Sequence, residues 1–423
     1  MLTPHPQRVA LHDEVHARPY ERMTAPLMLT HLALLTATGA ASREHLHTLL
    51  RARGLPLPRA DASHLSIDLG AVRLRWEAHT EFQTYTVWRA LDASPSTFDR
   101  AAVHDLPAEW LASMAGQWIV GLHVLVMHAG ESDGEALARA LLDENSLVGA
   151  GISDGQAHVY TDFRLHADGY ARQLLCVEAM NPRRLGRTVQ RLLEVETYRM
   201  MALLGLPVAR EVAATLGDAE RDLAQVAGEI RSAARDDEPA LLHQLTQLAG
   251  RVESLYAHTH ARFSASSAYF ELVQRRIGEL REVRHAGLQT LGEFLDRRLA
   301  PAMQTCVWAA RRQQALSERI SRISNLLRTR VEIEQQRSSQ DLLDAMNRRQ
   351  QAQLLLQSAV EGLSVAAVTY YGAGLVGYLA KGAKAAGLDV LPDLAVALCI
   401  PLIALGVWWG IRRLHARVAR NLG

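Results

Sequence analysis

The chain has 423 residues, enough for roughly two to three domains and for a sizeable buried core. Basic residues number 46 and acidic residues 45, so the net charge is only +1. This balance argues against a chain-wide nucleic-acid binder, which is usually strongly basic, and against an acidic disordered protein. The three cysteines, Cys176, Cys306 and Cys399, are far apart, so they predict neither a disulfide framework nor a zinc knuckle and fit a reducing compartment.

Residues 23–42 carry no charged side chain, and by length alone they match a membrane span. Pro26, His31 and Gly39 interrupt this stretch, so we predict a buried strand that runs into a helix. Residues 1–22 are interspersed with charges and lack the apolar run of a secretory signal peptide.

Residues 60–180 show the alternation and the β-branched and aromatic content that are typical of strands. Ser153-Asp154-Gly155 is a hairpin signal between two of these strands. We predict an α+β or α/β domain over residues 1–180. Its expected strands are 63–69, 72–76, 82–90, 117–127, 147–152, 157–163 and 170–177, and its expected short helices are 7–17, 42–53 and 134–142.

The second predicted domain, residues 181–360, is α-helical and begins with a helix at Asn181-Pro182. We expect Pro207, Pro239 and Pro301 to divide it into several helices.

A coiled-coil-like stripe of apolar residues follows, with steps of three or four residues. It consists of Leu316, Ile320, Ile323, Leu327 and Val331. Eight polar residues, 334–341, interrupt it. One long stalk helix is favoured over two consecutive helices, because no proline or glycine occurs between residues 302 and 361.

The third predicted domain, residues 361–423, is a two-helix transmembrane hairpin with a basic tail. Residues 362–380 and 394–411 are runs of 19 and 18 residues without a charge, just long enough to cross a bilayer. The alternative is a buried helical hairpin. Trp408-Trp409 stands directly before Arg412-Arg413, an arrangement typical of a membrane interface.

Charge predicts the orientation of this hairpin. Residues 1–204 have a net charge of −4 and residues 205–310 of −2, whereas residues 311–360 carry +4 and residues 361–423 carry +3. Arginines flank the two runs on the side of both the stalk and the tail, so the positive-inside rule predicts that both termini are cytoplasmic. The lipid bilayer is therefore an expected partner, and anionic headgroups would attract the basic end.

Three motifs suggest chemistry, and each has a simpler interpretation. His12-Asp13-Glu14-Val15-His16 nearly matches a zinc-protease motif, but the glutamate is misplaced and no third ligand is evident, so a surface helix is favoured. Gly130-Glu131-Ser132-Asp133-Gly134 matches a nucleophile elbow, yet the flanking carboxylates would oppose an oxyanion, so a turn and helix cap are favoured. Gly372-Ala373-Gly374-Leu375-Val376-Gly377 lies within an apolar run and predicts close helix packing rather than a dinucleotide site.

No catalytic, cofactor-binding or metal-binding residue is therefore predicted, and no small-molecule substrate is identifiable. Hydroxyl-bearing residues in the first apolar run suggest a narrow pore, with Ser364, Thr369 and Tyr370 as its lining, or equally a packed helix interface.

Both ends of the chain resemble a bacterial family of predicted membrane-anchored proteins, domain of unknown function 3422. The N-terminal resemblance rests on His5-Pro6-x-Arg8-x-x-Leu11 and on the block Glu14-Val15-His16-Ala17-Arg18-Pro19. The C-terminal one rests on Val360-Glu361-Gly362-Leu363-Ser364-Val365, Thr369-Tyr370-Tyr371 and Gly374-Leu375. The resemblance implies membrane anchoring in bacteria, hence an inner-membrane location, and no known activity. It marks Glu14, His16, Arg18, Pro19, Glu361, Gly362, Tyr370, Tyr371 and Gly374 as signature residues.

A weaker, architectural likeness connects the chain to CorA-type magnesium channels, which also combine a cytosolic domain, a long stalk helix and two C-terminal spans. The Gly-Met-Asn filter of those channels is absent here, and Lys381 and Lys384 lie where cations would enter.

The sequence thus predicts a membrane-anchored, mostly cytoplasmic and homo-oligomeric scaffold or sensor without an evident catalytic site. The alternative is a CorA-like, homo-oligomeric divalent-cation channel or transporter. An unrecognised enzyme in the N-terminal domain is the third hypothesis.

Overall fold

The structure is a computed structural model that describes residues 4–9, 11–12, 20–36, 39–60, 62–93, 97–130, 133–234, 237–386 and 391–421, with side chains as far as Arg413. The chain divides into two compact units, residues 1–324 and residues 325–423. The predicted three-domain division at residues 180 and 360 stays a prediction.

A nine-stranded sheet forms the centre of the first unit, in the order β2-β3-β4-β1-β5-β8-β7-β6-β9. Its neighbouring strands run antiparallel except for the pair β5 and β8, so the class is α+β. The strands are β1 (Leu27–Leu35), β2 (His64–Asp68), β3 (Arg73–Ala78), β4 (Phe82–Ala90), β5 (Gln117–His128), β6 (Val148–Ile152), β7 (Ala157–Thr161), β8 (Ala171–Val177) and β9 (Val283–Arg284).

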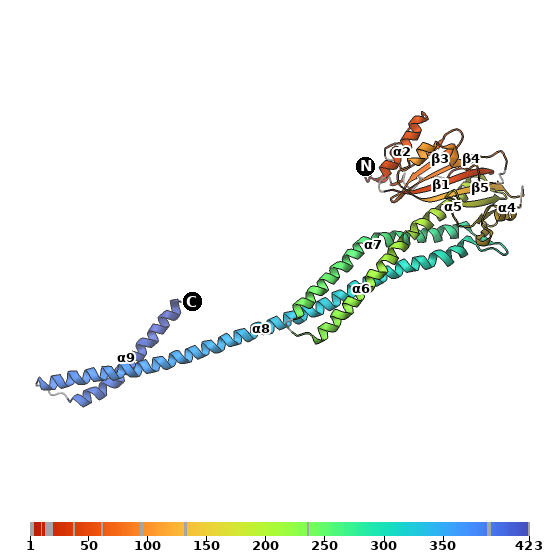
Figure 1. The fold of residues 1–423 in the computed structure, drawn as a ribbon. Helices are drawn as coiled ribbons and strands as arrows, with labels where there is room; N and C mark the ends of the chain where they lie inside the picture. Colours follow the sequence, from red (N-terminus) through yellow and green to blue (C-terminus); the bar gives the residue numbers. More distant parts are fainter. Residues whose placement is uncertain are drawn as a thin grey trace. The chain divides into compact units, whose positions relative to one another are not determined.

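Helices cover both faces of this sheet (Figure 1). On one face, α2 (Gly39–Ala52), α3 (Ala108–Ala112) and α4 (Gly134–Leu141) enclose a core around Trp76 and Tyr85. On the other face, α5 (Pro182–Leu203) packs Leu185, Val189 and Leu192 against apolar residues of β1, β5 and β8. Burial on two faces explains why the central strand β1 is buried over nearly its whole length.

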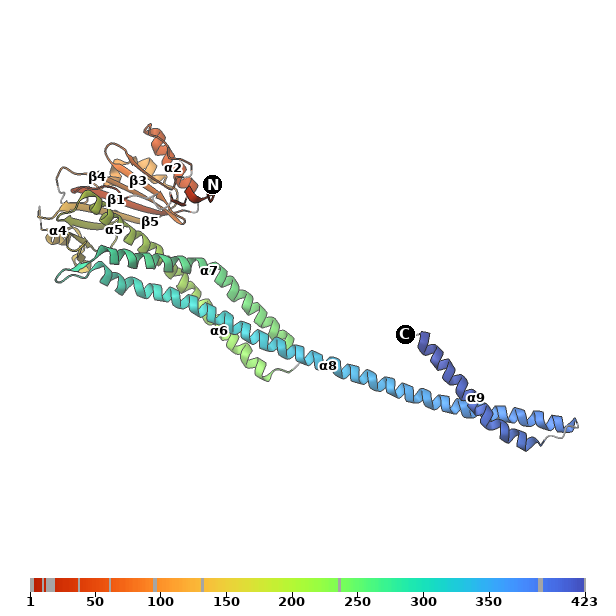
Figure 2. The ribbon, with the colours of Figure 1, turned by 180° about the vertical axis from the view of Figure 1, so that it is seen from behind.

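Beyond the sheet, α6 (Gly205–Ser232), α7 (Glu238–Leu280) and the first part of α8 (Leu291–Ala385) lie side by side (Figures 1 and 2). An apolar cluster with residues from α5, α6, α7 and α8 holds them together, Met303 and Phe263 among them. Across the surface of this bundle, Arg312 of α8 donates two hydrogen bonds of 2.6 Å to the Glu220 carboxylate of α6.

The start of α8 is capped twice. Thr290 and Glu293 exchange hydrogen bonds in a capping box, at 3.2 Å and 3.1 Å. The carboxylate of Glu282 accepts the backbone N–H groups of Leu291 and Gly292, at 2.8 Å and 3.0 Å. These bonds satisfy donors that would otherwise be left free at the helix end.

The elements follow the sequence prediction closely. All seven predicted strands are present, and the predicted strand and helix within residues 23–42 are β1 and α2. The hairpin between β6 and β7 turns at Ser153, Asp154 and Gly155, which all have positive φ. A single helix, α8, covers residues 291–385 and so includes the predicted stalk, as the absence of glycine and proline between residues 302 and 361 predicts.

Two details of the prediction are wrong. The prediction that residues 181–360 are entirely α-helical misses β9, whose two residues pair with β6 at the sheet edge and are too few to form a recognisable pattern. The expected helix break at Pro301 is also wrong, since this proline lies inside α8. Leu299 and Met303 on either side of it are buried in the helical core, and that packing offsets the backbone hydrogen bond that proline cannot make.

In the second unit, the end of α8 and the start of α9 (Pro392–Asn421) pack as an antiparallel hairpin (Figure 1). A methyl group built at Gly372 would lie 3.2 Å from Ile403, and one built at Gly377 would lie 3.2 Å from Val396. The predicted packing role of these glycines is therefore confirmed at two positions, whereas Gly374 faces open space.

Candidate functional site

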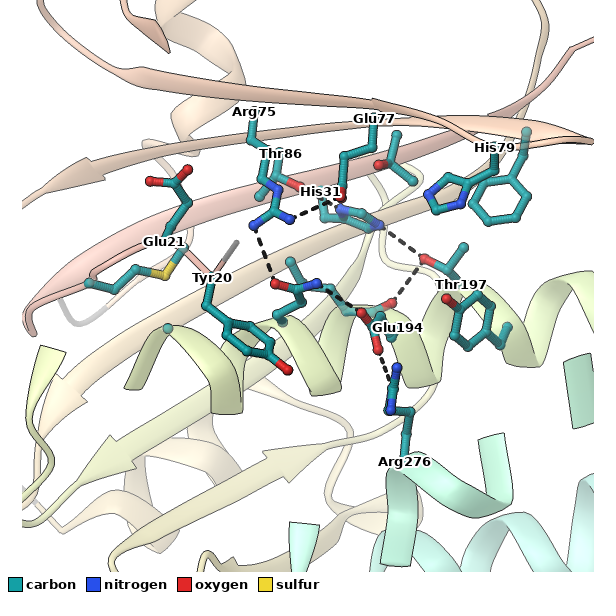
Figure 3. Close-up of a pocket in the computed structure, with 17 residues that line it drawn as sticks. Tyr20, Glu21, His31, Arg75, Glu77, His79, Thr86, Glu194, Thr197 and Arg276 are labelled. Atoms are coloured by element: carbon teal, nitrogen blue, oxygen red, sulfur yellow. Dashed lines mark hydrogen bonds and ion pairs between the residues drawn. The ribbon is translucent and has the colours of Figure 1, made fainter. Parts of the chain in front are cut away.

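A cavity of about 460 Å³ lies between the β3–β4 side of the sheet and α5, and we call it the α5 pocket (Figure 3). Its lining comes from four parts of the first unit: the segment before β1, the strands β1, β3 and β4, helix α5 and one residue of α7. The lining residues are Tyr20, Glu21, Met23, His31, Arg75, Glu77, His79, Phe82, Thr84, Thr86, Gly186, Gln190, Leu193, Glu194, Thr197, Tyr198 and Arg276.

Strand alternation explains why the pocket is polar. Arg75 and Glu77 of β3, together with Thr84 and Thr86 of β4, share the face that α5 covers. On the helix, polar residues recur three or four positions apart, so they face the same strands. Because both surfaces are polar here, they cannot close into a continuous apolar core.

His31 lies at the floor of the pocket and is buried. Its Nδ1 is 2.8 Å from the hydroxyl of Thr86, and its Nε2 is 3.0 Å from the hydroxyl of Thr197. The Thr197 hydroxyl also donates to the carbonyl of Leu193 at 2.9 Å, so it accepts from His31. The arrangement that satisfies all three bonds has a proton on Nε2 and makes Thr86 the donor to Nδ1.

The same ring is uncharged at neutral pH. Burial, with the nearby His79 and Arg75, lowers the pKa of His31 from 6.5 to about 3. A histidine with this pKa and with both nitrogens bonded is not poised to accept a proton at neutral pH. Its role in the pocket is therefore that of a neutral hydrogen-bonding group.

A chain of charge-assisted hydrogen bonds runs along one wall of the pocket (Figure 3). Arg75 donates to Glu77 at 2.9 Å and to Gln190 at 3.2 Å. Gln190 donates to Glu194 at 2.9 Å, and Glu194 also accepts a bond from Arg276 of α7. Each charge in this wall has an opposite partner, which lowers the cost of keeping it out of water.

The segment before β1 lies tightly against α5. A methyl group at Gly186 would lie 1.7 Å from the carbonyl oxygen of Glu21, so only glycine lets this segment lie against α5. Met23 in the same segment donates its N–H to the carbonyl of Pro182 at 3.1 Å, which holds the segment against the start of α5. Thr84 also lines the pocket, and its buried hydroxyl finds no hydrogen-bond partner among the described residues.

The sequence prediction missed this pocket. Charged residues at alternate positions of β3 and threonines at alternate positions of β4 are normally interpreted as the solvent side of a sheet. The missed signal is that α5 carries polar residues at the spacing of one helical face. The two patterns together mark a polar interface, but neither reveals that they meet.

The residues that the sequence singled out lie elsewhere. Glu14, His16, Arg18 and Pro19 fall outside the described residues. Glu361, Gly362, Tyr370, Tyr371 and Gly374 lie in the second unit, all on α8, and Tyr370 and Tyr371 are more than three-quarters exposed. Of the suggested pore residues, Ser364 and Thr369 donate their hydroxyl protons to carbonyls of their own helix, at 2.8 Å and 2.7 Å.

The two enzyme-like motifs lie partly outside the residues that the structure describes. His16 and Ser132 lie outside the described residues, whereas Asp133 caps α4 by accepting from the N–H groups of Glu135 and Ala136, as the helix-cap interpretation predicts. In the part of the chain that the structure describes, no three His, Cys, Asp or Glu residues are grouped to hold a metal ion.

Among the residues that the structure describes, three helical segments are long and apolar enough to cross a membrane, by length and composition alone. Two of them belong to the predicted hairpin, one on α8 and one at Pro392–Arg413, whose most apolar window has a mean hydropathy of 2.3 and no buried residue. The third, Pro182–Ser232, covers α5 and α6 and was not predicted. Its residues Leu185, Val189 and Val195 are buried in the cores of the first unit.

Comparison with known proteins supports the family resemblance. No curated protein matches the chain. The model of a family described as a protein of unknown function, DUF3422, matches residues 3–418. Because that match covers nearly the whole chain, the protein belongs to the DUF3422 family.

Proposed function

We propose that the protein is a membrane-anchored scaffold or sensor of the bacterial inner membrane, with most of its mass in the cytoplasm. The observation that carries this proposal is the bare apolar surface of α9. Leu398, Leu402 and Leu405 are each more than 60% exposed within a segment of which no residue is buried by protein. An apolar surface of this length is costly in water and fits the hydrocarbon core of a bilayer.

The end of α9 supports the same placement. The guanidinium groups of Arg412 and Arg413 lie 4.7 Å and 4.9 Å from the ring centres of Trp408 and Trp409. Tryptophan with an adjacent cation suits the headgroup layer, where the ring is half in lipid and the charge is in water. With the positive-inside rule, this pairing favours a cytoplasmic location for the basic tail and for the first unit.

We further propose that a second copy of the chain covers the part of α8 that precedes the membrane. Leu342, Met346, Leu356 and Val360 are between 56% and 70% exposed, at a spacing close to a heptad stripe. Chains anchored in the same orientation would meet in parallel along this surface.

Membrane anchoring can be tested by carbonate extraction of cell membranes. The full chain should stay in the pellet, and Leu402→Arg should release a large share of it, since arginine at mid-span costs about 3 kcal/mol. Leu343→Arg is the matched control, because Leu343 is also exposed on a helix but lies outside the proposed span. Release of the unsubstituted chain by carbonate would refute the anchor.

Self-association has a separate test. The mass of the full chain in detergent should correspond to an oligomer, and Met346→Lys with Leu356→Lys should reduce that mass to one copy. A single-copy mass for the unsubstituted chain would refute the oligomer and leave the anchor untouched.

A further inference from the structure

We propose that the α5 pocket binds a small, uncharged polyhydroxyl molecule, such as a monosaccharide or a sugar alcohol. This inference rests on the sensor part of the proposed function and gives it a class of ligand. The volume of about 460 Å³ lies within the range of small-molecule sites.

The hydroxyl of Thr84 is unsatisfied. Thr84 lines the pocket and is 4% exposed, and its hydroxyl oxygen is buried without a partner among the described residues. Leaving a buried hydroxyl unbonded is costly, and folded proteins seldom do so. A turn of this side chain toward the cavity would let a ligand hydroxyl supply the missing bond.

The charges in the wall of the pocket are balanced. Arg75 is paired with Glu77, and Arg276 with Glu194, so the deep charges cancel within the protein. An anionic ligand would have to compete with Glu77 or Glu194 for these guanidinium groups, and it would also meet Glu21 at the half-buried rim. A cationic ligand would face Arg75 and Arg276. A molecule without net charge avoids both costs.

The wall of the pocket offers both hydrogen-bond donors and hydrogen-bond acceptors. Guanidinium donors, carboxylate acceptors and the amide of Gln190 alternate along it, and Thr86 and Thr84 of β4 are the cross-strand neighbours of Arg75 and Glu77. An ammonium group only donates and a carboxylate only accepts, whereas each hydroxyl does both. A row of hydroxyls therefore matches an alternating wall better than a single charged group does.

The aromatic side of the pocket fits the same class. Phe82 is buried with its ring 4.3 Å from the ring of His79, and Tyr198 approaches it edge-on at 6.5 Å. The C–H face of a sugar or sugar alcohol can pack against such rings while its hydroxyls reach the polar wall.

The test uses the full chain purified in an amine-oxide detergent, since detergents with sugar headgroups would compete. Calorimetric titration compares glucose, mannitol and myo-inositol with charged counterparts: gluconate, glucose 6-phosphate and glucosamine. At least one neutral probe should bind saturably, and its charged counterparts should bind at least tenfold more weakly. Absence of saturable binding by all three neutral probes, or tighter binding of a charged one, would overturn the proposal.

Two variants test whether the neutral probe binds in the α5 pocket. Thr84→Val keeps the shape of the side chain and removes its hydroxyl, so it should weaken binding of the neutral probe at least tenfold. Thr246→Val is the matched control, because that hydroxyl is exposed on α7 and bonds to its own helix. Equal binding by wild type and Thr84→Val would refute the site. Because binding is measured in detergent, the result is independent of whether the chain resists carbonate extraction.

Discussion

His31 should make the first unit sensitive to mild acid. The ring is buried between β1, β4 and α5, with both nitrogens bonded to threonines and with Arg75 and His79 close enough to oppose a second positive charge. Protonation would also break the bond that Nδ1 accepts from Thr86. The perturbation to apply is His31→Gln, which removes the titrating group and keeps a polar side chain of similar length.

The size of the effect follows from the pKa of His31, which is about 3 in the folded chain and about 6.5 when the chain unfolds. Between these values the unfolded state binds a proton that the folded state does not, so stability present above pH 6.5 is lost as the pH falls. Over this range, each pH unit of acidification lowers the free energy of unfolding by about 1.4 kcal/mol. From neutral pH to pH 5 the loss assigned to His31 is therefore about 2 kcal/mol.

The assay is guanidinium unfolding of the full chain in detergent at pH 7.5 and pH 5, monitored by tryptophan fluorescence. Between the two pH values, the unfolding free energy of wild type should fall by about 2 kcal/mol more than that of His31→Gln. Thr197→Val keeps the buried ring and should retain the larger fall. Equal falls for wild type and His31→Gln would show that His31 is already protonated, or exposed, in the folded state, and would refute the reasoning.

Three further outcomes are expected. Gly186→Ala should destabilise the first unit by about 2 kcal/mol in the same unfolding assay, because its methyl group would overlap the Glu21 carbonyl. Gly228 lies in open space on α6, so Gly228→Ala should raise the free energy of unfolding by up to about 1 kcal/mol. Equal effects of the two substitutions would contradict this packing. Arg312→Met should cost about 1 kcal/mol through loss of the Glu220 pair, and the cost should shrink in 1 M salt; a cost that salt leaves unchanged would mean that packing dominates. Vesicles that contain the protein should pass Mg²⁺ no faster than empty vesicles, and a flux that Thr369→Ala alters would instead favour the CorA-like channel.

Much of the fold is predictable because its patterns are local. The strand 82–90 is rich in aromatic and β-branched residues and is β4 with the same bounds, and Asn181-Pro182 marks the start of α5, where the Asn181 side chain caps the helix. The predictions that failed concern residues whose structure depends on contacts with distant parts of the chain. Pro301 continues a helix because buried neighbours hold it there, and β9 is a strand only because it lies beside β6.

The α5 pocket was beyond prediction for a related reason. His31 appeared in the sequence only as an interruption of an apolar run, yet the sheet register places it directly opposite Thr86, and the docking of α5 brings Thr197 to its other nitrogen. His31 is 55 positions from Thr86 and 166 positions from Thr197, and the three residues share no motif. The predicted signature residues could be found because they are contiguous, and contiguity is unrelated to whether residues enclose a cavity.

The central claim is that the chain is anchored by its C-terminal hairpin with both ends in the cytoplasm. The most direct measurement is a pair of alkaline phosphatase fusions in bacterial cells, one inserted between residues 386 and 391 and one after Gly423. We predict that the phosphatase is active in the loop position and inactive at the C-terminus, since it works only outside the cytoplasm. Activity at the C-terminus, or inactivity at both positions, would contradict it.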